Sequence, residues 1–136
     1  MQSNIYLYFN GNCEEAMNFY KQALNGGEMM INRYGESPMP ASDAWKNKVL
    51  HGTLQAAETT FYFSDSNEGH EADFGNNFSV SLNFQSDEEI TNTFSAISAG
   101  GKITMPLQDT FWGAKFGMCT DKFNVNWMFN WDKPKH

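Results

Sequence analysis

The sequence predicts an α+β fold built from two βαβββ modules, and three observations support this prediction. The chain of 136 residues has the length of one domain. Hydrophobic residues make up 40% of it and aromatic residues 15%, which is typical of a chain that folds around a core. The order strand, helix, strand, strand, strand occurs twice. We therefore expect a single domain, residues 1–136, with a first module at about 1–65, a linker at about 66–76 and a second module at about 77–132.

The first module opens with a strand and a helix. Residues 5–9 are rich in β-branched and aromatic types, which indicates a strand. A helix is expected from Cys13 to Leu24, because apolar residues recur there at the spacing i, i+3, i+4, i+7 and Gly26-Gly27 then stops it. Three further strands are expected, the first of them followed by a loop rich in Pro and Gly; they span residues 29–34, 49–56 and 59–64.

The second module repeats this order after a polar segment, residues 65–77. Residues 78–84 alternate between apolar and polar types, which predicts a strand with one buried face. Ser86 and Glu89 have the spacing of a capping box and predict the start of a helix, which Gly100-Gly101 ends. Three more strands are expected at residues 102–107, 114–120 and 125–131.

The two helices superpose when 74 is added to the residue numbers of the first. The matched positions are Glu14-Glu15 with Glu88-Glu89, Ala16 with Ile90, Tyr20 with Phe94, Ala23 with Ile97, and Gly26-Gly27 with Gly100-Gly101. Chance agreement between two amphipathic helices that end in glycine is the alternative explanation. Because the matched positions share one register and three strands follow each helix, we interpret the chain as a duplication.

The charge pattern excludes several classes of function. Nine Lys and Arg residues stand against 16 Asp and Glu residues, so the net charge is −7, and the basic residues form no cluster that could neutralise phosphates. We therefore expect neither nucleic-acid binding nor attachment to anionic membranes. No apolar run approaches the ~18 residues that span a bilayer, and the first residues lack a signal-peptide pattern, so a cytoplasmic location is expected. Cys13 and Cys119 lie outside any CxxC motif and are expected to be free thiols.

Four motifs carry a resemblance to a known family. They are Phe9-Asn10-Gly11-Asn12-Cys13-Glu14-Glu15-Ala16, the segment 76–82, Met105-Pro106-Leu107-Gln108-Asp109-Thr110-Phe111-Trp112-Gly113-Ala114-Lys115-Phe116-Gly117, and the segment 120–127. These motifs resemble the PhnB-like branch of the vicinal oxygen chelate superfamily, which includes glyoxalase I, the extradiol dioxygenases and the bleomycin and fosfomycin resistance proteins. The resemblance implies the glyoxalase / bleomycin resistance / dihydroxybiphenyl dioxygenase fold, in which paired βαβββ modules form curled mixed sheets around a central cavity. It also implies a homodimer, in agreement with the high aromatic content.

Some relatives in this branch are described as 3-demethylubiquinone methyltransferases. The sequence offers no support for methyl transfer, because no Gly-rich loop joins a strand to a helix and no parallel-sheet pattern provides a place for S-adenosylmethionine. We therefore expect this description to be mistaken for this chain.

The resemblance also implies where a divalent metal would be bound. Metal enzymes of the superfamily hold the ion with side chains from the first and last strand of each module. These positions fall here on Ile5, Ser79 and Met128, and within about one residue of Tyr62. Ile5 has no lone pair to donate, and Ser79 and Met128 are poor ligands for Zn, Ni or Mn. Because divalent catalysis needs about three hard or imidazole donors, we expect this metal site to be lost and no cofactor to be bound.

Alternation along the strands predicts which side chains line the cavity. Hydrocarbon from Ile5 and Leu7 would line one half, and mostly neutral hydrogen-bonding groups would line the other. The complete predicted set is Ile5, Leu7, His51, Thr53, Tyr62, Ser79, Ser81, Trp112, Asn126 and Met128. Trp112 is expected either to close the cavity as a stacking wall or to be a core or dimer-interface aromatic. His51 is interpreted either as a hydrogen-bonded structural histidine or as a cavity residue that binds an anionic or phenolic group or acts as a general base.

Three hypotheses for the function follow. The first is a metal-independent protein that binds a small, partly apolar molecule in its cavity and forms a homodimer. The second is an enzyme, a lyase or dioxygenase relative, that uses an unconventional metal set or His51 as general base. The third is a structural or interaction protein whose cavity is vestigial and filled by its own side chains, including Phe9 and Trp112.

Overall fold

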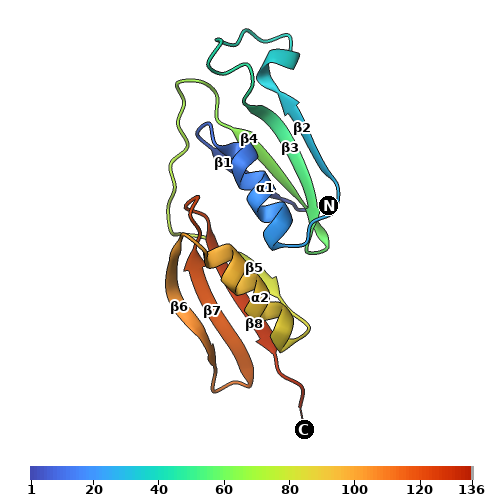
Figure 1. Ribbon diagram of the computed structural model, residues 1–136, viewed down its shortest axis with the longest axis vertical. Coiled ribbons are helices and arrows are strands. Elements are labelled where there is room, and N and C mark those ends of the chain that lie inside the picture. Colours follow the sequence, from blue (N-terminus) through green and yellow to red (C-terminus); the bar gives the residue numbers. More distant parts are fainter. Residues whose placement is uncertain (136) are drawn as a thin grey trace. The chain divides into compact units, whose positions relative to one another are not determined.

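The computed structural model describes residues 1–135 and divides the chain into two compact units (Figure 1). The first unit runs from Met1 to Asp73 and the second begins at Phe74. Each unit contains one four-stranded mixed sheet and one helix that packs against it. The predicted α+β architecture of two βαβββ repeats is therefore confirmed, and each sheet is open, with two edge strands.

The first unit has the strand order β1-β4-β3-β2, with β1 parallel to β4 and the other pairs antiparallel. Its elements are β1 (Ile5–Phe9), α1 (Cys13–Ala23), β2 (Met29–Arg33), a 3-10 turn (Tyr34–Glu36), β3 (Val49–Ala56) and β4 (Thr59–Asp65). The sequence predicts each of these elements except the short 3-10 turn. The helix covers one face of the sheet and leaves the other face, here called the helix-free face, without a helix of this unit (Figure 1).

The apolar stripe of α1 packs on the centre of this sheet. The ring of Tyr20 lies 6.5 Å from that of Phe9 and 6.1 Å from that of Phe63, and all three side chains are fully buried. Gly52 on β3 allows the close approach, because a Cβ atom there would lie 2.6 Å from the terminal methyl of Met17. The burial of these rings accounts for much of the core of the first unit.

A buried carboxylate takes the place of the usual N-cap of α1. The side chain of Asn12, at the N-cap position, makes no capping hydrogen bond. Instead Oδ1 of Asp65 accepts hydrogen bonds from the backbone N–H groups of Gly11 (2.7 Å) and Cys13 (3.0 Å), and Oδ2 accepts one from Val49 (2.9 Å). Asp65 lies at the end of β4 and is 1% exposed. Its hydrogen bonds therefore connect the end of this strand to the start of α1 and to the start of β3.

The second unit has the strand order β5-β8-β7-β6, with β5 parallel to β8. Its elements are β5 (Val80–Asn83), α2 (Asp87–Ser98), β6 (Lys102–Asp109), β7 (Ala114–Thr120) and β8 (Asn126–Asp132). The predicted N-cap is present, because Ser86 Oγ accepts from Glu89 N–H at 3.1 Å. The side chain of Glu89 reaches one residue further back than in a capping box, since its Oε1 accepts from Gln85 N–H at 3.2 Å. The helix buries Ile90, Phe94 and Ile97, and the ring of Phe94 meets that of Phe129 edge-on at 5.0 Å.

Candidate functional site

The strand register of the first unit decides which side chains lie on the helix-free face. Tyr6 on β1 pairs with Tyr62 on β4, which pairs with Thr53 on β3. The neighbouring row, Leu7, Phe63 and Gly52, faces α1, as the contact of Gly52 with Met17 shows. Since successive side chains of a strand point to opposite faces, the helix-free face carries the row of Tyr6, and His51 lies on it two residues before Thr53.

The prediction that Ile5 and Leu7 line the cavity together with His51 is wrong. Both residues lie on the face that α1 covers, and Leu7 is 4% exposed in the core beside Phe63. The helix-free face of β1 instead presents Tyr6 and Tyr8. The predicted orientation of His51, Thr53 and Tyr62, away from the helix, agrees with the register. Phe9 is likewise fully buried in the core and fills no pocket on the helix-free face.

Three tyrosines and one histidine form a cluster on this face, here called the Tyr–His cluster: Tyr6, Tyr8, His51 and Tyr62. The ring of Tyr6 lies 4.9 Å from that of Tyr8 and 5.9 Å from those of His51 and Tyr62, and the rings of His51 and Tyr62 are 5.5 Å apart. The Tyr6 hydroxyl lies 3.2 Å from His51 Nδ1. Burial, with a smaller contribution from Tyr8, raises the pKa of Tyr6, so its phenol stays protonated at neutral pH and can donate to the imidazole.

The helix-free face of the second sheet carries polar side chains and methionine. Ser81 pairs with Met128 and Asn83 with Asn130, while Trp127 and Phe129 are buried on the side of α2. This is the alternation that the sequence predicts for β8. Asn126 is held by its neighbours, because its Oδ1 accepts from the Thr120 hydroxyl at 2.7 Å and its Nδ2 donates to the Gly75 carbonyl at 2.9 Å. Ser79, half-buried, precedes β5 and stands two residues before Ser81.

Trp112 lies on the loop between β6 and β7 and is 56% exposed. Its ring is 4.9 Å from that of Phe111, which is 97% exposed, and 6.2 Å from that of Phe116. The alternative that Trp112 is a core aromatic is therefore wrong. Its role as a cavity wall or as a dimer contact stays a prediction.

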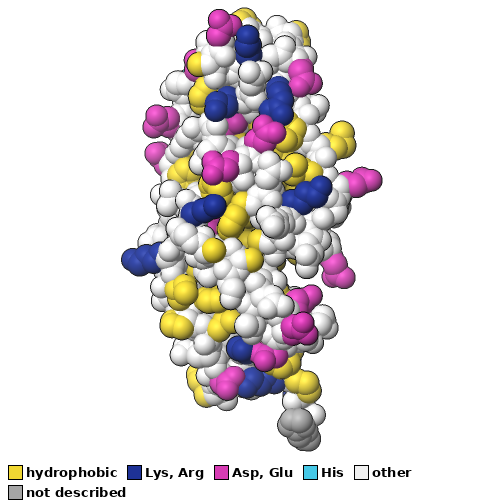
Figure 2. Space-filling model, viewed as in Figure 1, with side chains coloured by type: hydrophobic (Ala, Val, Ile, Leu, Met, Phe, Trp, Pro, Cys, Tyr) yellow, Lys and Arg dark blue, Asp and Glu magenta, His cyan; other side chains and the backbone are white. Residues whose placement is uncertain are grey.

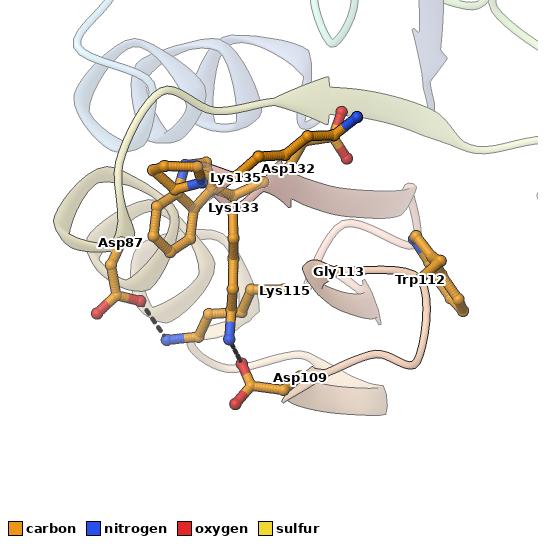
Figure 3. A pocket seen from close by; sticks show the side chains of 10 residues that line it. Asp87, Asp109, Trp112, Gly113, Lys115, Asp132, Lys133 and Lys135 are labelled. Atoms are coloured by element: carbon orange, nitrogen blue, oxygen red, sulfur yellow. Dashed lines mark hydrogen bonds and ion pairs between the residues drawn. The ribbon is translucent and has the colours of Figure 1, made fainter.

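A groove of about 840 Å³ in the second unit holds a network of ion pairs that the sequence did not reveal (Figure 3). Lys115 Nζ lies 2.5 Å from Asp87 Oδ1, and Lys133 pairs with Asp109. The hydrogen bond and charge of Lys133, together with the nearby charge of Lys115, hold the pKa of Asp109 below its usual range. Trp112 lies beyond Gly113, apart from these charges (Figure 3). The four partners come from α2, the end of β6, the start of β7 and the segment after β8. Because they are far apart in the sequence, no local motif predicts these ion pairs.

These charges balance one another within the groove. Three lysines and three aspartates line it: Lys115, Lys133, Lys135, Asp87, Asp109 and Asp132. A second groove, of about 560 Å³, lies in the first unit beside the start of α1, and there Arg33 donates to both Glu14 oxygens at 2.8 and 3.1 Å. On the surface drawn in Figure 2, acidic and basic side chains are interspersed in the same way. Neither groove therefore selects a ligand of one charge.

The positions implied for a divalent metal include one on the helix-covered face of the first sheet. Ile5 lies on the helix-covered face, and within residues 1–135 no three His, Cys, Asp or Glu side chains gather where an ion could bind. Cys13 and Cys119 are both buried free thiols. Burial, assisted by Asp121, raises the pKa of Cys119 to about 12, and burial near Asp65 raises the pKa of Cys13 as well. Among the described helices, none is long and apolar enough to cross a membrane.

Comparisons with known proteins place these features in a family. A family model described as 3-demethylubiquinone-9 3-methyltransferase matches residues 2–129. Protein YjdN of Escherichia coli (strain K12) is 35% identical over 136 residues, which cover 92% of this chain and 91% of YjdN. The crystal structure of protein PA1353 from Pseudomonas aeruginosa has 40% identity and a TM-score of 0.89, with 98% of this chain and 99% of that chain covered.

Two further solved structures extend the likeness. The PhnB protein of Bacillus cereus is 30% identical with a TM-score of 0.81, and the match covers 96% of this chain and 99% of that chain. A glyoxalase/bleomycin resistance protein/dioxygenase family enzyme from Burkholderia phytofirmans has 12% identity and a TM-score of 0.64, covering 96% and 98% of the two chains. At this identity the likeness concerns the fold alone, and the fold is that of the glyoxalase superfamily.

Proposed function

The chain belongs to the family described as 3-demethylubiquinone-9 3-methyltransferase, in its PhnB-like form with the glyoxalase fold, and from this premise we propose that it binds a small, partly apolar molecule without a divalent metal. The proposed binding surface includes the helix-free face of the first sheet. There the Tyr–His cluster offers apolar ring surface beside hydroxyl and imidazole groups. Sites for small organic ligands combine these two features, apolar walls and a few placed polar groups.

The Tyr–His cluster is the observation that carries this proposal. Tyr6 is 40% exposed and Tyr8 52% exposed, so both rings retain surface that a ligand could cover. Rings ordered by mutual stacking lose little further entropy when a ligand packs on them. Thr53, Ser79, Ser81, Trp112, Asn126 and Met128 remain proposed contacts, alongside His51 and Tyr62.

Binding without a metal is supported by the donors that the strands supply. Of the four positions at which metal enzymes of the superfamily hold their ion, Ile5 provides no lone pair and is turned toward α1. Ser79 and Met128 provide a neutral hydroxyl and a thioether, which bind Zn²⁺, Ni²⁺ or Mn²⁺ weakly. Tyr62 alone offers an oxygen with acidic character, and one such donor is fewer than the three that a catalytic site needs.

Methyl transfer is not part of the proposal, in spite of the family's description. In the first unit a strand does lead into a helix, but the connection Asn10-Gly11-Asn12 contains one glycine. The backbone N–H groups of Gly11 and Cys13 at this helix start already donate to the Asp65 carboxylate. Helix starts that hold nucleotide-like cofactors keep these groups free for the ligand.

A homodimer in the cytoplasm completes the proposal. Large apolar side chains of the second unit, Phe78, Phe111 and Trp112, are more than half exposed, which is typical of surfaces that a partner covers. An enzymatic alternative is favoured by the same contact in its other tautomer: if Nδ1–H of His51 donates to the Tyr6 oxygen, Nε2 keeps its lone pair, as a general base requires. Replacement of His51 by Ala would abolish turnover in that case.

Native mass spectrometry of protein purified without chelator or affinity metal tests the proposal. We expect a dimer without stoichiometric metal, and a mass increment where an organic ligand is retained. One metal ion per chain would overturn the metal-independent function and move the enzymatic alternative to first place. A monomer at micromolar concentration would overturn the dimer.

A further inference from the structure

The helix-free face of the first sheet carries no formally charged side chain among the residues that the strand register places on it. These residues are Tyr6, Tyr8, Met30, Asn32, His51, Thr53, Gln55, Thr60, Tyr62 and Ser64. Charged residues make up 18% of the chain and normally collect on exposed surfaces. A charged ligand that bound to this face would lose its hydration without gaining a contact with an opposite charge. The transfer of such a ligand from water to this face is therefore costly.

The face is instead suited to a flat ring. Four aromatic rings lie with neighbouring centroids 4.9 to 5.9 Å apart, and their planes are inclined by 22° to 46°. Centroid separations of this size are those at which aromatic rings attract one another beyond the burial of their area. A further ring that packs against the exposed parts of Tyr6 and Tyr8 would extend the same arrangement.

One hydrogen-bonding position lies within this aromatic surface. Nδ1 of His51 is engaged by the Tyr6 hydroxyl at 3.2 Å, while the described residues offer its Nε2 no hydrogen-bond partner. If the Tyr6 hydroxyl donates to Nδ1, that nitrogen carries no hydrogen, and the imidazole hydrogen is on Nε2. Nε2–H then donates, and the group that it binds must be an acceptor.

We infer that the helix-free face of the first sheet binds an uncharged aromatic compound with a hydroxyl or carbonyl oxygen, which accepts a hydrogen bond from His51 Nε2 while the ring packs on Tyr6 and Tyr8. This inference rests on the proposed function and narrows it to one ligand class. It distinguishes this face from the groove of the second unit, where three lysines and three aspartates are present.

Three probes of equal ring size test the inference: 2-naphthol, 2-naphthoate and 2-methylnaphthalene. Each is titrated at neutral pH into the ¹⁵N-labelled full chain, and backbone amide shifts in β1, β3 and β4 report binding to this face. We expect 2-naphthol to bind saturably and 2-naphthoate to bind at least about tenfold more weakly, because its charge finds no partner. We expect 2-methylnaphthalene, which lacks the oxygen, to bind about two- to tenfold more weakly than 2-naphthol.

Matched variants of His51 separate the contribution of its aromatic ring to 2-naphthol binding from the contribution of its hydrogen bond. His51→Phe keeps an aromatic ring and should weaken 2-naphthol by about two- to tenfold, whereas His51→Gln retains an N–H donor and should recover part of the affinity. Glu88→Gln on α2, where the side chain is exposed, is the control and should leave the titration unchanged. Circular dichroism verifies that each variant is folded.

The outcomes distinguish the inference from the proposed function. If 2-naphthoate binds as well as 2-naphthol, or if His51→Phe has no effect while Tyr6→Ala abolishes binding, the face binds small molecules but the inferred ligand class is wrong. If none of the three probes shifts the amides of β1, β3 and β4, binding at this face, and with it the proposed function there, is overturned.

Discussion

The hydroxyl of Tyr6 reaches Nδ1 of His51 across an intervening strand. Tyr6 lies on β1 and His51 on β3, and β4 separates these strands in the sheet. The contact therefore passes beside the ring of Tyr62, which lies on β4 and within 6 Å of both partners, at 5.9 and 5.5 Å. The contact thus links the two strands that flank β4, on a face that no helix of the unit covers.

Removal of this hydroxyl should have a small but measurable cost. Tyr6→Phe deletes one hydrogen bond between half-exposed groups, and we expect the free energy of unfolding to fall by about 0.5–1 kcal/mol in urea titrations. Tyr8→Phe is the control, because the Tyr8 hydroxyl makes no hydrogen bond to any described residue, and its effect should stay below about 0.5 kcal/mol. Equal losses in the two variants would contradict the contact.

Loss of the buried Asp65 carboxylate should be far more damaging. Asp65→Ala leaves three backbone N–H groups without acceptors, so we expect the free energy of unfolding to fall by roughly 3 kcal/mol or more. Asp65→Asn keeps one oxygen acceptor and should cost less. The exposed Asp73→Asn serves as control, and a similar effect of Asp73→Asn and Asp65→Ala on the denaturant midpoint would show that the carboxylate does not cap α1.

The ion pair of Glu14 and Arg33 predicts a dependence of stability on pH. The hydrogen bond from Arg33 lowers the pKa of Glu14 below its value of about 4.3 in the unfolded chain. The pair therefore contributes stability above about pH 4.3 and loses it as the pH falls through the lower folded value. Because Glu14 is partly exposed, we expect less than about 1 kcal/mol.

Glu14→Gln is the variant that measures this contribution. The difference in unfolding free energy between the parent chain and the variant should be largest near neutral pH and should vanish under strongly acidic conditions. In an Arg33→Gln background the same Glu14→Gln substitution should show a smaller change with pH, because the partner of Glu14 is absent. A difference that grows as the pH falls would have the wrong sign for a lowered pKa.

The two cysteines should resist alkylation while the chain is folded. Thiolates are the reactive form, and burial raises the pKa of Cys119 to about 12 and that of Cys13 as well, so almost no thiolate is present near pH 8. Intact-mass measurement after treatment with iodoacetamide should show no adduct in buffer and two in denaturant. Rapid labelling of the native chain would mean that one of the sites opens readily.

Element positions could be predicted because strong local signals mark their ends. The spacing of Ser86 and Glu89 is a property of the sequence alone, and in the structure Ser86 is the N-cap and accepts from Glu89 N–H. Residues 5–9 and 49–56 were expected as strands and are strands with those bounds. The repeat added independent support, because each module was predicted from its own residues.

Which of the two faces of β1 is buried could not be predicted from such local signals. All five residues of this strand are large and apolar or aromatic, so alternation does not tell which of the two sets is buried. The pairing of Leu7 with Phe63 and of Tyr6 with Tyr62 decides it, and that pairing depends on the tertiary fold. The same limit hid the role of Asp65, which in sequence begins a polar segment and in the structure meets N–H groups 52 and 54 residues away.

That separation along the chain has a consequence for the order in which the first unit folds. Helix α1 is complete by residue 23, but the carboxylate that accepts from its first N–H group, that of Cys13, arrives only with residue 65. During synthesis, a nascent chain that ends within β3 therefore holds a helix of 11 residues without its cap, and isolated helices of this length are marginal in water. The last strand of the unit thus completes the start of its first helix, and we expect the unit to become stable only once β4 has been synthesised.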